Sequence, residues 1–261
     1  MKQKLDYDIE HFTIIDSHCH ASSKFEVFQK NMETFNIKKF CLMPTVIEND
    51  FNDLDNYFNK VKSINAKFKN TCFIFGALDF SKTPEENREL ILNQRDKEKI
   101  KGIKVHHEQN FLLDKKYLQP YFKIIEDVFG FDFPIYIHTD WPLIGERLKP
   151  TKLKDSFSKF PNYFPDFKFI MGHGGGSGAY VSIWKVCKKY SNVYVESSMC
   201  PTTQSLEEVI WRVGEDRVIF GSNFPYCGIS VEIVKILSLY QVTDEDRENI
   251  FYNNAKVLFE L

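Results

Sequence analysis

The sequence predicts one α/β domain, a closed (β/α)8 barrel of the TIM-barrel class, and three observations favour this fold. Eight short apolar runs alternate with helix-like segments along a chain of 261 residues, a usual length for such a barrel. The runs are apolar enough to be buried on both faces, as parallel strands are. No linker rich in proline, glycine or serine divides the chain, so we expect a single domain over 1–261, with 1–11 as an amino-terminal extension. A doubly wound open sheet is the alternative, but no Gly-x-Gly-x-x-Gly follows the first run.

Each predicted strand is a short run of β-branched, aromatic and other apolar residues that ends at a polar residue, a glycine or a proline. The runs cover residues 13–20, 39–44, 71–78, 100–106, 133–138, 167–173, 192–197 and 217–223. Strands that alternate with helices in this way form parallel sheets, because each helix returns the chain to the same end of the sheet.

The predicted helices show apolar residues at helical spacing. In 50–69, for example, Leu54, Tyr57 and Val61 lie along one stripe. The helix that opens at Thr83 has a proline in its first turn and acidic residues near its positive end. The predicted helices are 26–36, 50–69, one that opens at 83, 115–128, 152–160, 179–190, 205–213, 231–239 and 244–258.

Composition narrows the class of protein. The net charge is −2 and no basic block is present, which argues against nucleic acid or an anionic membrane as a partner. The six cysteines are scattered, a pattern typical of reduced thiols in the cytoplasm. We see no signal peptide, and no apolar run approaches the roughly 20 residues that span a bilayer. We therefore expect a cytoplasmic protein that acts on a small molecule.

Polar residues at the ends of the predicted strands indicate a metal site. His18 and His20 are two residues apart, so on a strand both side chains leave the same face and can bind one ion. This pair alone is a weak signal, but His138, His173 and Asn223 end later strands. In a barrel the carboxyl ends of all strands meet at one mouth. Three imidazoles there would hold a catalytic zinc and leave a position for water.

The order of these residues resembles the amidohydrolase superfamily, and most closely its branch called amidohydrolase family 2. The matching pieces are Ile15–His20, Ile137–His138, Met171–Gly175, Phe220–Pro225 and Asn253–Phe259. The resemblance runs from about residue 12 to residue 261. That branch contains metal-dependent hydrolases and non-oxidative decarboxylases that act on small, often carboxylated, substrates. Its members are often dimers or larger, so a homodimer is an expectation.

The resemblance implies His18, His20 and His138 as ligands of one divalent metal ion, with His173 binding substrate or activating water. Three histidines suit Zn²⁺, although Mn²⁺, Fe²⁺ or Co²⁺ could occupy the site. Where the family has a strand-eight aspartate that binds metal and often accepts a proton, this chain has Asn223. An amide oxygen can coordinate weakly but cannot take a proton from water, and losing a positioned base costs about 10²–10⁴ in rate.

Three functions follow from this pattern. We expect first a hydrolase, in which a metal-bound water attacks the carbonyl of a small amide, ester or lactone, with His173 or Asn223 beside it. The alternatives are a non-oxidative decarboxylase of a small carboxylated substrate in the same site, and a protein that binds metal or ligand with catalysis impaired by Asn223.

The predicted fourth and fifth strands offer substrate-binding candidates. Lys104 and His106 are two residues apart and share a face. Lys104 could bind a substrate carboxylate or pack at the mouth, and in two-metal relatives a strand-four lysine is carbamylated and bridges the ions. Asp140 and Trp141 follow the fifth strand, where loop side chains shape the pocket.

The roles of two carboxylates on the predicted strands are left open. Asp16 either supports a histidine or adds polarity at the barrel centre, and Glu196 either enters the site or pairs with a lysine or arginine.

Overall fold

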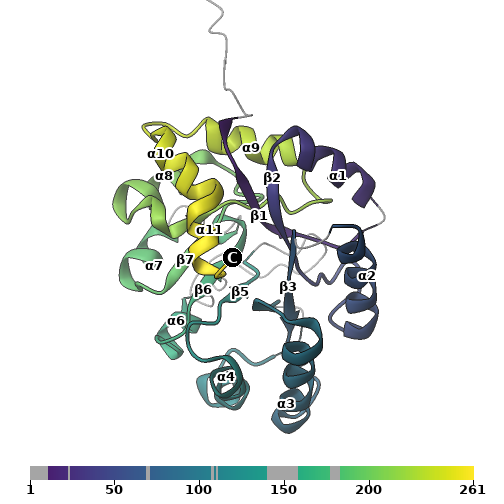
Figure 1. Cartoon of the computed structure of the whole chain (residues 1–261). Coiled ribbons are helices and arrows are strands. Elements are labelled where there is room, and N and C mark those ends of the chain that lie inside the picture. Colours follow the sequence, from purple (N-terminus) through teal and green to yellow (C-terminus); the bar gives the residue numbers. More distant parts are fainter. Residues whose placement is uncertain are drawn as a thin grey trace, which may run out of the picture.

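Eight parallel strands pair in chain order, from β1 to β8, and the sheet curls into a barrel (Figure 1). The computed structural model describes residues 11–22, 24–68, 71–106, 109, 111–139, 158–176 and 183–261. The strands are β1 (Ile14–Cys19), β2 (Ile37–Leu42), β3 (Cys72–Ala77), β4 (Gly102–Val105), β5 (Ile135–Ile137), β6 (Phe169–Met171), β7 (Val193–Glu196) and β8 (Val218–Ile219). Most of their residues are buried, because helices cover the outside and side chains fill the inside. The predicted (β/α)8 barrel is confirmed.

The barrel closes where the chain after β8 runs beside β1. The Ser17 N–H donates to the Phe220 carbonyl oxygen at 2.9 Å. Farther along, the Asn223 N–H donates to the His18 carbonyl oxygen at 2.7 Å. β8 itself ends at Ile219, so these bonds continue the pairing to the carboxyl end of the barrel. The first motif of the chain and the strand-eight motif are therefore direct neighbours.

Helices surround this ring in the positions that the periodicity predicts (Figure 1). They are α1 (Phe25–Thr34), α2 (Leu54–Lys67), α3 (Pro84–Asn93), α4 (Lys115–Phe129), α6 (Lys159–Tyr163), α7 (Ile183–Lys189), α8 (Thr203–Arg212), α9 (Ile229–Leu237), α10 (Asp244–Glu248) and α11 (Asn254–Leu258). A π-helical turn joins α10 to α11, so the predicted helix 244–258 has an irregular middle. Parts of the predicted helices 152–160 and 179–190 lie outside the described residues. No helix in the described part of the chain is long and apolar enough to cross a membrane.

Two helix starts follow directly from local sequence. The Asp53 carboxylate accepts the Asn56 N–H at 3.0 Å and so caps α2. The predicted start at residue 50 is too early, because Asp53 has φ −141° and ψ 71°, outside the α-helical region. At α3 the Thr83 hydroxyl accepts the Glu86 N–H, and the Glu86 carboxylate accepts the Thr83 N–H at 2.8 Å. This capping box stabilises the helix start by about 1 kcal/mol.

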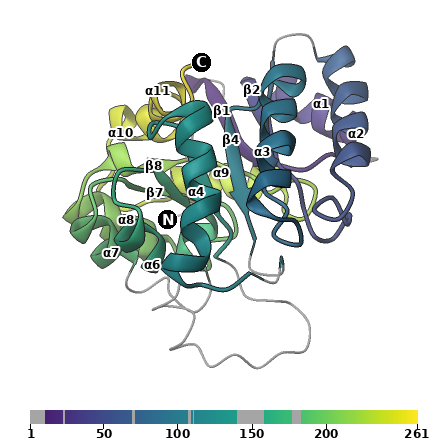
Figure 2. The same cartoon turned by 90° about the horizontal axis from the view of Figure 1, so that it is seen from below.

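The barrel interior is packed and is closed at one end by α11. Buried aromatic and aliphatic side chains from the strands, such as Phe75, Tyr136 and Ile170, form one cluster with the carboxyl-terminal residues. The Phe259 ring lies 5.0 Å from the ring of Phe73, the second residue of β3. Figures 1 and 2 show α11 and the carboxyl terminus across this end of the ring. Only the opposite end, where the strands finish, is left for polar chemistry.

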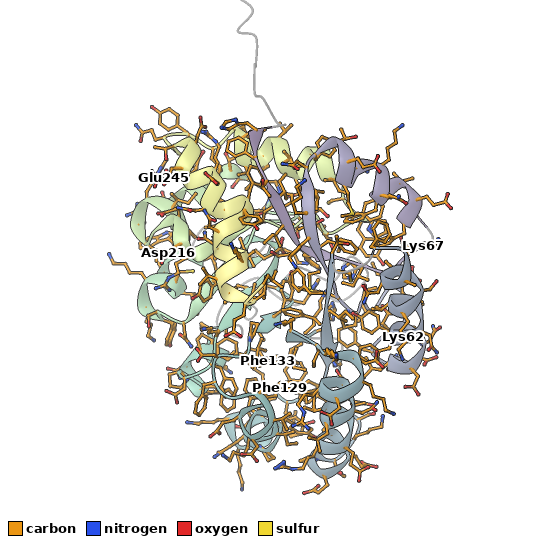
Figure 3. The ribbon with its side chains drawn as sticks, in the orientation of Figure 1. Lys62, Lys67, Phe129, Phe133, Asp216 and Glu245 are labelled. Carbon is orange, nitrogen blue, oxygen red and sulfur yellow. The ribbon has the colours of Figure 1, made fainter. Side chains whose placement is uncertain are left out.

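A second, larger core fills the space between the strands and the helices. Many of its aromatic side chains contact one another, and Figure 3 labels one such pair, Phe129 and Phe133. The rings of Phe129, at the end of α4, and Phe133, before β5, stack at 3.9 Å with an angle of 6°. This pair fixes the turn that leads into β5, because stacked rings hold both ends of a short connection in place.

Candidate metal centre and active site

The polar residues that the sequence singled out lie at the carboxyl ends of the strands. His18 is in β1 and His20 follows it, while His138, His173 and Asn223 come just after β5, β6 and β8. The imidazole of His173 is 5.1 Å from that of His18 and 4.7 Å from that of His138, measured between ring centroids. All five side chains are buried except that of His138, which is half-buried. The barrel therefore gathers the expected metal ligands and catalytic residues into one group.

Three polar atoms in this group have the spacing of ligands around one ion. The Nε2 atoms of His18 and His20 are 3.1 Å apart, and His20 Nε2 is 3.0 Å from Asn223 Oδ1. Ligands that each lie about 2.1 Å from the same metal ion are separated by roughly 3.0–3.4 Å at ordinary coordination angles. His138 is brought to the same end of the barrel through its contact with His173.

The partners of these histidines fix where their protons lie. His20 Nδ1 is 2.8 Å from the Met43 carbonyl oxygen, which can only accept, so Nδ1 carries the proton. His18 Nδ1 is 3.1 Å from Glu196 Oε2, and the same reasoning applies. Burial lowers the pKa of both histidines well below the usual value, so both are neutral near pH 7. Each Nε2 therefore presents a lone pair, which a metal ligand requires.

This arrangement fits a divalent cation. The Lys104 ammonium donates to His18 Nε2 at 3.3 Å. His20 Nε2 and Asn223 Oδ1 then face each other as two acceptors, and no described side chain places a donor between them. The Asn223 amide nitrogen points away and donates to the Met199 sulfur at 2.7 Å. Buried acceptors without a donor are costly, and a shared cation would satisfy both.

Both candidates from the fourth strand reach the same mouth. Lys104, only 1% exposed, lies in β4 with its ammonium 5.2 Å from the centre of the Tyr136 ring. Burial lowers the pKa of Lys104 to about 7. His106 follows β4, and its ring centroid is 4.0 Å from that of His138. The other two substrate-binding candidates, Asp140 and Trp141, lie outside the described residues.

His173 has a strained backbone and a neutral ring. The predicted strand 167–173 ends early, at Met171, because His173 has a φ of 55° in the turn that follows. Its Nε2 is 3.2 Å from His138 Nδ1, and its Nδ1 is 3.0 Å from the Ser198 hydroxyl. Burial lowers the pKa of His173 to about 4, so the imidazole is neutral near pH 7 and keeps a lone pair on one ring nitrogen.

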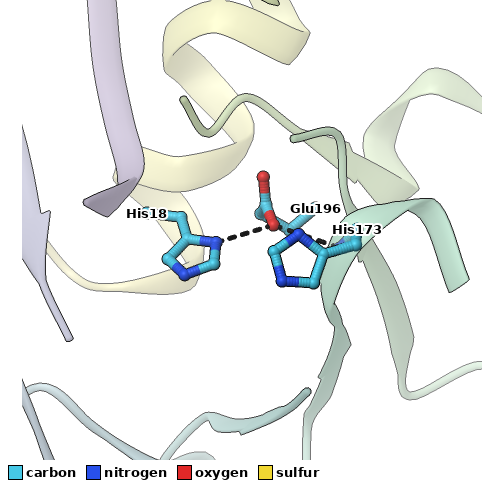
Figure 4. A group of neighbouring side chains, drawn as sticks. All are labelled: His18, His173 and Glu196. Carbon is cyan, nitrogen blue, oxygen red and sulfur yellow. Dashed lines mark hydrogen bonds and ion pairs between the residues drawn. The ribbon is translucent and has the colours of Figure 1, made fainter. Parts of the chain in front are cut away.

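Glu196, which the sequence left open, enters the site. It is the last residue of β7, and His18, His173 and Glu196 offer atoms that all lie within 4.8 Å of one another (Figure 4). Its Oε2 also accepts the Tyr136 hydroxyl at 2.8 Å. Sequence reasoning missed Tyr136, although a signal existed: it precedes His138 by two residues on a strand and so shares its face.

Asp16 supports the site through the backbone. Its carboxylate accepts the Ser222 hydroxyl at 2.6 Å, the Ser222 N–H at 2.9 Å and the His18 N–H at 3.2 Å. Burial raises the pKa of Asp16 to about 7. Asp16 therefore holds β1 against the turn after β8, and these bonds do not involve a histidine ring.

Comparisons with known proteins agree with this barrel. A gamma-resorcylate decarboxylase from Polaromonas sp. is 24% identical over an alignment of 180 residues, and the match covers 54% of this chain and 55% of that protein. The chain thus spans about half the length of the relative that it matches.

Two solved structures share the fold along nearly the whole chain. A dihydroxybenzoic acid decarboxylase from Polaromonas sp., with bound manganese and the inhibitor 2-nitroresorcinol, has a TM-score of 0.71 at 16% identity and covers 96% of this chain and 97% of its own. An aspartate-to-asparagine variant of 5-carboxyvanillate decarboxylase from Novosphingobium aromaticivorans, with bound manganese and 3-methoxy-4-hydroxy-5-nitrobenzoic acid, has a TM-score of 0.70 at 17% identity, with coverage of 97% and 98%.

The amidohydrolase family model matches residues 46–261, from the end of β2 onward. The match includes His138, His173 and Asn223, while the His18 and His20 motif precedes it. Because it covers most of the chain, this protein belongs to the amidohydrolase family.

Proposed function

We propose that this protein is a divalent-metal-dependent, non-oxidative decarboxylase of a small hydroxylated aromatic carboxylate. One observation carries the choice among the three expected functions: an amide, Asn223, stands 3.0 Å from His20 Nε2, where a hydrolase would need a carboxylate base. The similar proteins support the same choice, because they are decarboxylases of dihydroxybenzoate and carboxyvanillate. The hydrolase that the sequence first suggested has no such support.

The chemistry explains why asparagine suits one reaction better than the other. Hydrolysis needs a base that removes a proton from the attacking water, and an amide cannot serve. Decarboxylation needs no attacking water. The bond between the ring carbon and the carboxylate breaks, its electron pair stays on the ring, carbon dioxide leaves, and the ring carbon takes up one proton. Asn223 is therefore left with a task that an amide oxygen can perform, which is to face a cation.

In this proposal each residue at the carboxyl end of the barrel has its own role. His18, His20 and Asn223 would hold the cation, with His138 as the expected further ligand. A bound divalent ion would act as a Lewis acid that draws negative charge from substrate oxygens. Lys104 would bind the substrate carboxylate, because its ammonium lies 3.3 Å from His18 Nε2 and so beside the ion. His173 Nε2 carries the lone pair, because Nδ1 is engaged by Ser198, so it would take a proton from a substrate hydroxyl or from water and pass it to the ring carbon.

The test is a substrate panel on protein loaded with Mn²⁺ or Zn²⁺. We expect carbon dioxide release from at least one dihydroxybenzoate or carboxylated methoxyphenol, and no turnover of esters, lactones or amides. His173→Gln should abolish that release, while His11→Ala, a matched change at an exposed histidine, should leave it intact. Ester or lactone turnover that depends on His173 would overturn the proposal in favour of hydrolysis. Metal binding and ligand-induced thermal shifts without any turnover would overturn it in favour of a binding protein.

A further inference from the structure

Glu196 is a buried carboxylate surrounded by donors from four parts of the barrel. Oε2 faces His18 Nδ1 at 3.1 Å and accepts the hydroxyls of Tyr136 at 2.8 Å and Ser198 at 2.9 Å. It also accepts the His173 N–H at 3.3 Å, while Oε1 accepts the Ser198 N–H. The residue is 0% exposed. With its lone pairs taken by N–H and O–H groups, this carboxylate is placed to orient its neighbours rather than to bind the ion.

The space for this carboxylate is kept by two glycines. A Cβ built on Gly221, just after β8, would overlap Glu196 Oε1 and lie 2.8 Å from His18 Cβ. A Cβ on Gly172, just after β6, would overlap the Tyr136 hydroxyl. Neither glycine has a positive φ, so backbone freedom does not explain their presence. Close packing against Glu196 and its partner Tyr136 explains why both positions are glycine.

The carboxylate also sets the direction of a chain of hydrogen bonds. A carboxylate only accepts, so the Ser198 hydroxyl proton points to Glu196. The Ser198 oxygen is then left as an acceptor for His173 Nδ1 at 3.0 Å, so the proton of His173 is on Nδ1. The same carboxylate takes the Nδ1 proton of His18 directly. Both rings are thereby held as the Nδ1–H tautomer, with the lone pair on Nε2.

We infer that Glu196 is the positioning residue of this site, fixing His18 as a metal ligand directly and His173 as a proton carrier through Ser198. This inference deepens the proposed decarboxylase, and the role of His173 rests on it. The two effects are separable, because His18 Nδ1 contacts Glu196 directly, whereas His173 Nδ1 is linked to it through Ser198. Removing the carboxylate should disturb both histidines. Removing the Ser198 hydroxyl should disturb His173 most, because His18 Nδ1, 3.3 Å from that hydroxyl, keeps Glu196 at 3.1 Å and the Tyr136 hydroxyl at 2.9 Å.

The experiment compares metal affinity and ring tautomers in three variants. Glu196→Gln should weaken Zn²⁺ or Mn²⁺ binding by about 10–100-fold, the usual effect of losing a partner behind a metal-ligating histidine. Ser198→Ala should leave the metal Kd within about threefold of wild type and lower kcat by at least tenfold. Glu207→Gln is the matched control, because Glu207, on α8, is also buried but accepts the N–H of Tyr240, which follows α9, and so lies away from the site. It should leave metal affinity and turnover unchanged.

Nitrogen-15 NMR of the histidine side chains gives a readout that needs neither activity nor a substrate. Metal-free wild type should show His18 and His173 protonated at Nδ1. Ser198→Ala should change the protonation pattern of His173 and leave His18 protonated at Nδ1, where Glu196 remains its partner. A wild-type spectrum with His173 protonated at Nε2 would overturn the inference, even if Glu196→Gln failed to fold. A folded Glu196→Gln variant with wild-type metal affinity would overturn it as well. Failure of the proposed decarboxylase would appear as absent turnover with these metal affinities and tautomers intact.

Discussion

Replacing Asn223 with aspartate should separate the stability of the metal-free protein from its affinity for metal. The Asn223 side chain is 4% exposed, its oxygen faces His20 Nε2 at 3.0 Å, and its nitrogen donates to the Met199 sulfur at 2.7 Å. Asn223→Asp keeps the shape and replaces that donor with a second acceptor. Without metal, a carboxylate would be buried between a nitrogen lone pair and a sulfur atom. With metal, it would become a charged ligand.

The two effects have opposite signs and measurable sizes. An unsatisfied buried acceptor costs about 1–3 kcal/mol of unfolding free energy. In a chain of this length each kcal/mol shifts Tm by roughly 2–4 °C, so the metal-free Tm should fall by roughly 2–12 °C. A tenfold tighter Kd is worth about 1.4 kcal/mol, so at a fixed excess of metal the rise in Tm should grow by roughly 3–6 °C.

Thermal melts with and without Mn²⁺, together with calorimetric titration of the ion, measure both quantities. Asn223→Ala is the companion variant, because it removes the ligand oxygen without adding charge and should show a smaller metal-induced rise than wild type. If Asn223→Asp gave a metal-induced rise equal to or below that of wild type, Asn223 would not face the ion, and our account of the site would fail.

Three further outcomes are expected. Elemental analysis of the purified protein should find one ion per chain, and the double change His18→Ala and His20→Ala should remove it; two ions per chain would instead make Lys104 a bridging ligand. Lys104→Met should raise KM for the carboxylated substrate by about 10–100-fold, because losing a buried charged hydrogen bond costs about 1.5–3 kcal/mol. An unchanged KM would exclude Lys104 as the partner of the substrate carboxylate. Tyr57→Phe should lower the unfolding free energy by about 1–2 kcal/mol in a denaturant titration. The reason is that the buried Tyr57 hydroxyl lies 2.8 and 2.9 Å from carbonyl oxygens of β2 and β3. An unchanged free energy would mean that water replaces the hydroxyl.

The fold could be predicted because its signal is local and repeated. Each apolar run reports the burial of its own residues, and eight such runs with helices between them leave few alternatives to a barrel. Because the signal is local, it predicts the ends of helices and strands less well than their presence. Asp53, with a backbone outside the α-helical region, delays α2, and His173, with a positive φ, follows the early end of β6. Both conformations belong to turns that periodicity does not describe.

For a related reason, only part of the candidate site could be predicted from the sequence. His18, His20, His138, His173 and Asn223 could be predicted because they lie at or just after the ends of four strands. Glu196 stayed open, and Tyr136 and Ser198 were missed, because their roles depend on contacts between strands. A glutamate at the end of β7 looks the same in a sequence whether it meets a lysine or a histidine. Only the closed ring places it against β1, β5 and β6.

Binding of an ion would also affect the stability of the junction between β1 and the chain after β8. His20 and Asn223 are 203 residues apart, so an ion bound to both would act as a removable cross-link between the two ends of the fold. Joining chain segments that far apart costs on the order of 5 kcal/mol in loop entropy, which backbone pairing, the Asp16–Ser222 bonds and core packing must offset when no ion is present. Chelation should therefore loosen this junction before any other, and amide hydrogen exchange should rise first at Ser17, His20 and Asn223. Equal protection with and without metal would show that the barrel closes independently of its ion.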